Sequence, residues 1–163
     1  YIFDGRADLI DIDISEMEIT DCTFNNSGND AIDAMTSNVL ISNTYISESG
    51  DKGLSAGESS TVSVSNLTFD NTQIAIQSKD GTYVSVSDSK FLNNKLQLDA
   101  YQKNWRYGDG GRIEVDNSLF ESDENLITAQ KRSRITVSNS YFNTSYSHLQ
   151  NKRVNFVDNQ ITN

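Results

Sequence analysis

The sequence predicts an all-β protein, a single-stranded parallel β-helix of about seven coils with about 22 residues in each coil. Three observations lead to this fold class. Apolar and polar residues alternate in short V-x-V segments, which is the pattern of strands with one buried face. These segments recur at a nearly constant interval, and Asn or Asp follows each of them at a fixed position.

A column of Phe and Ile residues defines the repeat. In each segment an apolar residue is followed by another two places later, by Asp or Asn two places after that, and by Phe or Ile three places further on. The successive Phe or Ile positions are 22, 23, 22, 29, 22 and 19 residues apart. Stacked coils would place these side chains in one buried column, which consists of Phe24, Ile46, Phe69, Phe91, Phe120, Phe142 and Ile161.

A second, aliphatic column has the same period, and a small residue follows most of its members two places later. A repeat of this length cannot bury its apolar side alone, so neighbouring coils must stack to complete the core. The aliphatic column is Ile10, Ile32, Leu54, Ile76, Leu98, Ile127 and Leu149, and the small residues are Ala34, Ala56, Ser78, Ala100 and Ala129.

The fixed Asp or Asn position predicts a ladder of turns. Both residue types tolerate the left-handed backbone conformation, and stacked amides can hydrogen-bond along the coil axis. The members of this ladder are Asp21, Asn43, Asn66, Asp88, Asn117, Asn139 and Asp158.

Residues 1–163 are expected to form one β-helix domain with an insertion at residues 101–112. The glycines Gly108, Gly110 and Gly111 indicate that the insertion is a projecting loop. No amphipathic helix precedes the first core position, and the sequence stops just after the last one. Open ends expose unpaired backbone groups, so we expect either a longer natural chain or end-on docking with another molecule, which includes end-to-end self-association.

Charge and composition restrict the partners. The 13 basic and 23 acidic residues give a net charge of -10, which disfavours nucleic acid and suits cation binding or solubility. A run of about 18 apolar residues would indicate a membrane span, and the sequence contains none. The lone His148 has no serine or cysteine partner nearby, and with the single cysteine Cys22 it cannot form a Cys/His metal site.

Four phrases carry a family resemblance over residues 28–116: "GNDAIDAMTSNVLISN", "GDKGLSAGE", "AIQSKDGTYVSV" and "DAYQKNWRYGDGGRIEV". They resemble the right-handed parallel β-helix domain of secreted bacterial proteins that carry a CotH-type spore-coat kinase module. The resemblance implies a right-handed coil and an extracellular or cell-surface setting. It implies no kinase activity, because the phosphate-loop and catalytic-loop motifs are missing from this sequence. The wider relatives of this pectate-lyase-like superfamily act on polysaccharides.

Aspartates near the start of the chain stand at equivalent positions of successive coils. Stacked carboxylates repel one another, so such columns usually need a cation, a basic neighbour or free solvent. Calcium is the expected cation, because it accepts several carboxylate oxygens in irregular geometry. The candidate calcium ligands are the pair Asp8 and Asp30, the pair Asp11 and Asp33, and the adjacent Asp51.

Lys52 is the candidate base of a calcium-dependent polysaccharide lyase or epimerase, by resemblance to lyases of this fold in which a Lys or Arg removes the C5 proton of a uronate. Neighbouring carboxylates oppose this role, since they favour the charged ammonium. A cation site without catalysis and a solvated salt bridge are the alternatives. A second charged group, Glu58 with Lys79 and Asp80, is interpreted as a salt bridge across coils.

The insertion supplies the candidate carbohydrate-binding residues. Aromatic rings can stack on sugars, and Arg can pair with carboxylates. In the alternative interpretation, Trp105 folds back to cover the flank of the solenoid. The candidates are Tyr101, Lys103, Trp105, Arg106, Tyr107 and Arg112.

Three functions are compatible with these features. The leading hypothesis is a non-catalytic extracellular or cell-surface module that binds a polysaccharide or a partner protein along its flank. The second is the calcium-dependent lyase or epimerase, which lacks a complete set of acid, base and charge-stabilising groups in the sequence. The third is a structural spacer that stacks through its open ends.

Overall fold

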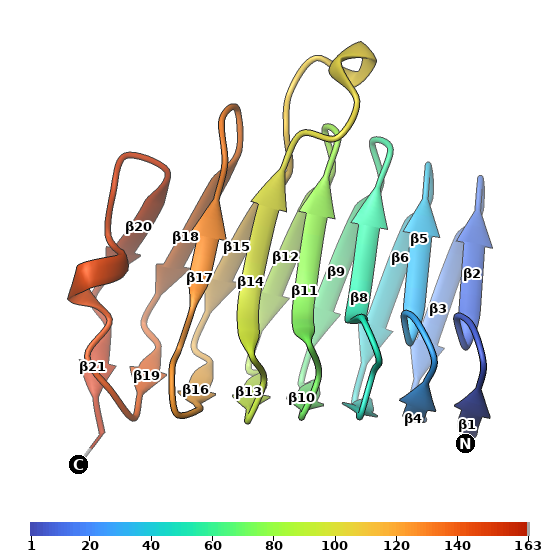
Figure 1. The fold of residues 1–163 in the computed structure, drawn as a ribbon, viewed down its shortest axis with the longest axis horizontal. Coiled ribbons are helices and arrows are strands. Elements are labelled where there is room, and N and C mark those ends of the chain that lie inside the picture. Colours follow the sequence, from blue (N-terminus) through green and yellow to red (C-terminus); the bar gives the residue numbers. More distant parts are fainter. Residues whose placement is uncertain (163) are drawn as a thin grey trace.

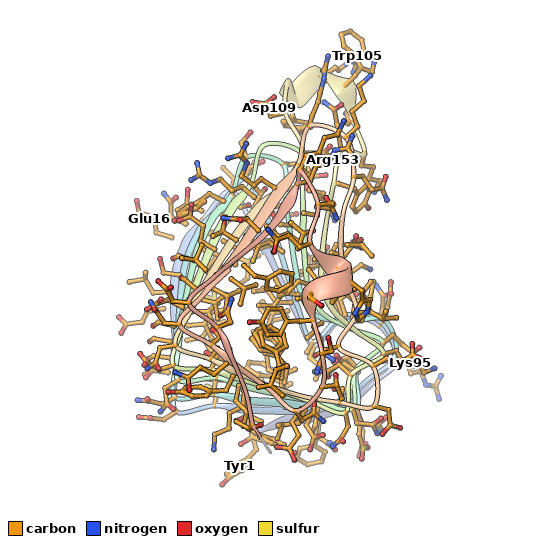
Figure 2. The ribbon with its side chains drawn as sticks, turned by 90° about the vertical axis from the view of Figure 1, so that its left-hand side faces the viewer. Tyr1, Glu16, Lys95, Trp105, Asp109 and Arg153 are labelled. Carbon is orange, nitrogen blue, oxygen red and sulfur yellow. The ribbon has the colours of Figure 1, made fainter. Side chains whose placement is uncertain are left out.

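The protein is a solenoid of three parallel sheets, and the computed structural model describes residues 1–162 of it. The chain visits sheet A, sheet B and sheet C in turn, and each circuit is one coil (Figure 1). Viewed along the axis, the three sheets enclose the core as the sides of a triangle (Figure 2). Asn163 lies outside the described residues.

The strands are short, and every pairing between them is parallel. Sheet A holds β1 (Ile2–Gly5), β4 (Thr23–Ser27), β7 (Tyr45–Ser47), β10 (Thr68–Asp70), β13 (Lys90–Leu92), β16 (Leu119–Glu121), β19 (Tyr141–Phe142) and β21 (Gln160–Ile161). Sheet B holds β2 (Ile10–Asp13), β5 (Ile32–Met35), β8 (Lys52–Gly57), β11 (Ile74–Lys79), β14 (Leu96–Tyr101) and β17 (Ile127–Ala129). Sheet C holds β3 (Glu16–Thr20), β6 (Asn38–Ser42), β9 (Thr61–Ser65), β12 (Tyr83–Ser87), β15 (Arg112–Asp116), β18 (Arg134–Ser138) and β20 (Val154–Val157).

The predicted columns are confirmed in the strand register. Ile32, Leu54 and Ile76 are direct partners on successive strands of sheet B and are fully buried. In sheet A, the rings of Phe91 and Phe120 stack with centroids 4.6 Å apart, which is the spacing of neighbouring strands. The core is therefore continuous from coil to coil.

The last coil departs from the predicted column. Leu149 packs against the core from the short helix η2 (Ser147–Leu149), and sheet B has no strand there among residues 1–162. The ring of Tyr146 lies 4.5 Å from that of Phe142 and 4.8 Å from that of Phe156. These rings partly cover the C-terminal end of the core, which the sequence alone predicts to be open.

The predicted turn ladder is confirmed by the backbone. All seven residues of the Asp/Asn column have φ between 45° and 54°, in the left-handed region. Amide side chains connect neighbouring turns, as in the 2.9 Å hydrogen bond that Asn66 Nδ2 donates to Asn43 Oδ1. Asn and Asp residues thus stabilise the turn between sheets C and A in each coil.

Substitutions at Asn66 test this role of the turn ladder. Asn tolerates the φ of +54° at this position because of its short polar side chain, which Ala lacks, and the change Asn66→Ala also removes the side-chain hydrogen bond. We expect the free energy of unfolding to fall by about 1–2 kcal/mol, measured by chemical denaturation. The control Asn66→Gly should lose less, because glycine accepts a positive φ. Equal losses in both variants would contradict a backbone origin of the effect.

Candidate functional site

The first predicted pair of aspartates lies at the corner between sheets A and B, where each carboxylate caps the next coil. Asp8 Oδ1 accepts hydrogen bonds from the backbone N–H of Asp30 at 2.8 Å and from Asn29 Nδ2 at 2.7 Å. Asp30 Oδ1 in turn accepts one from the backbone N–H of Lys52 at 3.1 Å. These oxygens therefore already hold the chain in register.

Lys52 supplies the positive charge at this corner. Its Nζ lies 3.3 Å from Asp30 Oδ1 and also pairs with Asp51. Burial raises the pKa of Asp30, and the charge of Lys52 offsets only part of that shift. Burial lowers the pKa of Lys52, but its hydrogen bond to Asp51 and the charges of both carboxylates outweigh burial and raise it. The ammonium thus stands where a cation was expected.

The second predicted pair lies on the outer face of sheet B. Asp11 and Asp33 are register partners on β2 and β5. The pKa of Asp11 is raised first by the charge of Asp13, then by burial and by Asp33. Within the described part of the chain, Asp33 Oδ1 is buried and has no hydrogen-bond partner.

The five candidate calcium ligands therefore divide between a corner and a sheet face and do not form one donor set. No group of three or more acidic, Cys or His side chains in metal-binding geometry occurs among residues 1–162. A metal would have to displace Lys52 at the corner or use the carboxylates of the sheet face. The calcium site stays a prediction.

The charged group further along sheet B does not contain the expected salt bridge. Lys79 is 8% exposed, lies across Gly57 and donates to Ser55 Oγ at 3.2 Å. Burial raises the pKa of Glu58, and the charge of Lys79 opposes the shift. Of the ion pairs found among residues 1–162, none includes Lys79. The predicted salt bridge among Glu58, Lys79 and Asp80 is therefore wrong.

Asp80 positions the inserted loop. It is fully buried, and its Oδ1 accepts hydrogen bonds from the backbone N–H groups of Lys103 and Asn104, each at 2.7 Å. Asn104 Oδ1 then caps the short helix η1 (Trp105–Tyr107) by accepting from the N–H of Arg106 at 3.1 Å. A carboxylate from the preceding coil thus fixes where the loop leaves sheet B.

The loop projects beyond the corner between sheets B and C and carries Trp105 at its top (Figures 1 and 2). Trp105 is 76% exposed, so the interpretation in which it folds back over the flank is wrong. The Arg106 guanidinium lies 5.9 Å from the centroid of the Trp105 ring. Tyr107 is 39% exposed on the same turn. The loop therefore offers an open aromatic surface with a cation beside it.

The six candidate carbohydrate-binding residues do not all lie together. Tyr101 ends β14 on sheet B, where it is half-buried, whereas Arg112 begins β15 on sheet C. Arg112 lies 5.5 Å from the ring of Tyr83 and pairs with Glu114. Lys103, Trp105, Arg106 and Tyr107 belong to the exposed connection between these two positions.

Several contacts that the sequence does not reveal hold the loop in place. The N–H of Gly111 donates to the carbonyl of Tyr101 at 3.0 Å, which closes the base of the loop. A Cβ at Gly111 would fall 2.0 Å from the carbonyl oxygen of Ser78, so only glycine fits there. Arg132 Nη1, from the following coil, donates to the carbonyl of Gly108 at 2.9 Å. The glycines were the one visible signal of this anchoring.

The outer face of sheet C is a second feature that sequence reasoning missed. An open hollow of about 750 Å³ lies on it, and Ser side chains from successive strands are among the residues that line it. Ser63 and Ser85 are register partners whose hydroxyls lie 3.2 Å apart. The Tyr83 hydroxyl donates to Glu114 Oε2 at 2.6 Å across the same face. The V-S-V-S segments were the available signal.

A family model described as "Right handed beta helix region" matches residues 2–142, which span β1 to β19. The match confirms the fold class and the right-handed coil. Neither the curated proteins nor the solved structures gave a match. Among residues 1–162 no helix has the length and apolar character needed to cross a membrane.

The variant Lys52→Met tests the charge balance at the corner. We expect the free energy of unfolding at neutral pH to fall by about 1–3 kcal/mol, because ionised Asp30 remains buried without its cation. The pKa of Asp30 should rise further above its unfolded value of 3.8, so the folded state takes up a proton first as the pH falls. The loss of stability should therefore shrink at acidic pH.

Chemical denaturation at several pH values checks this expectation. The control Lys95→Met removes an exposed lysine from the same kind of corner and should change stability little at any pH. A loss in Lys52→Met that does not depend on pH would show that Asp30 is not the group affected.

Proposed function

The chain belongs to the right-handed β-helix family, and from that premise we propose that it is a non-catalytic extracellular or cell-surface module that binds polysaccharide at its projecting loop. The observation that carries the proposal is the 76% exposure of Trp105 at the top of an anchored loop. A single exposed ring is ordinary on a protein surface, but Tyr107 is exposed on the same turn, and a group of exposed rings marks an interaction site.

The chemistry of the loop suits a sugar ring. An indole face packs against the apolar C–H face of a pyranose, while guanidinium and ammonium groups donate to its hydroxyls. Trp105 and Tyr107 provide the rings, and Arg106 and Lys103 provide the donors. The four side chains lie within five consecutive residues, so one or two sugar units could contact all of them.

The anchors of the loop favour binding, because a preformed surface loses less conformational freedom when a ligand arrives. Asp80 holds the start of the loop through two backbone N–H groups. Arg132 holds Gly108, directly after η1. Trp105 is thus exposed on a backbone that is tied to both neighbouring coils.

The state of Lys52 favours binding over polysaccharide cleavage. A lyase or epimerase would need an uncharged amine to abstract the C5 proton. Asp51 and Asp30 raise the pKa of Lys52 and pair with its ammonium, so the group is held in its protonated form. A protonated Lys52 gives the lyase hypothesis less support than the binding hypothesis.

The proposed setting rests on the resemblance to β-helix domains of secreted CotH-type proteins. The spacer hypothesis receives less support at the C-terminal end, where Tyr146 and Phe156 already cover part of the core.

The variant Trp105→Ala tests the proposed function. Its retardation in affinity gels that contain neutral or acidic polysaccharides should weaken about tenfold or more, because truncating a central aromatic contact costs about 2 kcal/mol. The matched control Tyr141→Ala removes a 39% exposed ring from sheet A and should bind like the wild type. Unchanged mobility of the wild-type protein across a broad panel of polysaccharides would contradict the proposal.

A further inference from the structure

Basic side chains gather in one pocket of this acidic protein. The pocket has a volume of about 420 Å³ and lies at the corner between sheets B and C, below the projecting loop. Five of the 13 cationic residues of the chain line it, while Asp109 is the one acidic residue in its lining. The cations are Arg112, Arg132, Arg134, Lys152 and Arg153.

The coil register places three of these arginines in one column. Arg112 is the register partner of Arg134 on β15 and β18. Ile135 pairs with Val154, which puts Arg153 next to Arg134 on the following coil. Neighbouring strands are about 4.8 Å apart, so the three arginines occupy adjacent backbone positions and their positive charges repel one another.

Carboxylates of the protein compensate little of this charge. Arg112 pairs with Glu114, and Arg132 donates to a backbone carbonyl. Among residues 1–162, Arg134, Lys152 and Arg153 form no salt bridge. The pocket therefore has an excess of positive charge that an anion would neutralise.

Ser133 and Gly110 form the inner wall of the pocket. Ser133 is 7% exposed, and its hydroxyl has no hydrogen-bond partner within residues 1–162. A Cβ at Gly110 would fall 2.0 Å from Ser133 Oγ, so Ser133 packs directly against the glycine and no larger residue fits there.

We propose that this pocket binds an anionic substituent, a carboxylate or a sulfate, of the polysaccharide that contacts Trp105. The inference rests on the proposed function and makes the ligand an acidic polysaccharide. Guanidinium groups suit this role because their paired N–H donors match the geometry of carboxylate and sulfate oxygens.

The connection between the pocket and the loop favours a glycan as the ligand. Asp109, Gly110 and Gly111 line the pocket and directly follow Gly108, which Arg132 holds next to η1. One chain of sugars could therefore stack on Trp105 and place an acidic group among the arginines.

The double variant Arg134→Gln/Arg153→Gln tests the inference. Its affinity for polygalacturonate and for dextran sulfate should fall about tenfold or more, because hydrogen bonds to charged groups are worth about 1.5–3 kcal/mol each. Its binding to uncharged dextran should equal that of the wild type.

A matched double variant controls for the change in net charge. Lys90→Gln/Lys95→Gln also removes two cations, and Lys95 lies at a different corner of the triangle from Arg153 (Figure 2). It should leave all affinities close to those of the wild type. Thermal denaturation of each variant verifies that the fold is retained, so that a loss of binding is not a loss of structure.

The outcomes separate the inference from the proposed function. One outcome would overturn the inference and leave the proposed function intact. In that outcome the protein binds uncharged dextran through Trp105, binds acidic polymers no more tightly, and is unaffected by the arginine changes. Absence of binding to any polymer would overturn both. Equal losses in the two double variants, or tighter arginine-dependent binding of a single-stranded oligonucleotide, would overturn the assignment to an acidic polysaccharide.

Discussion

The structure depends on one constraint, the hydrogen bonding of each strand to its equivalent one coil away. This pairing places side chains about 22 residues apart directly over one another, as Phe91 lies over Phe69 and under Phe120. A residue type that recurs in every coil therefore forms a continuous feature along the whole solenoid. Apolar residues form a continuous core, and Asn or Asp residues form a continuous line of left-handed turns.

The same constraint makes charge on a column costly, and the protein treats two charged columns differently. At the corner between sheets A and B, the column of Asp8 and Asp30 continues with Lys52, which neutralises the buried carboxylate. On sheet C, the column from Arg112 to Arg153 continues with cations alone. The first column contains both acidic and basic side chains, whereas the second needs an anion from a bound ligand to balance its positive charge.

The fold could be predicted from the sequence because the signals that specify it are local and repeat in every coil. Strand alternation, the interval of 22 residues and the turn residues all agree, so the register of Ile32, Leu54 and Ile76 followed directly. The direction of individual charged side chains was not predictable in this way. Asp30 turns toward the backbone of Lys52 and Asp33 lies on a sheet face, although both stand at repeat positions that look alike in the sequence.

The conformation of the inserted loop could not be predicted from the repeat. Its length and glycines identified it, but its conformation is set by residues of other coils, namely Asp80 before it and Arg132 after it. These contacts hold Trp105 away from the core and form one wall of the arginine pocket with Gly110. A solenoid tolerates extra residues at a corner because the strands on both sides keep their partners. The break in the repeat is therefore the place where this fold can acquire an aromatic surface and a pocket without disturbing its columns.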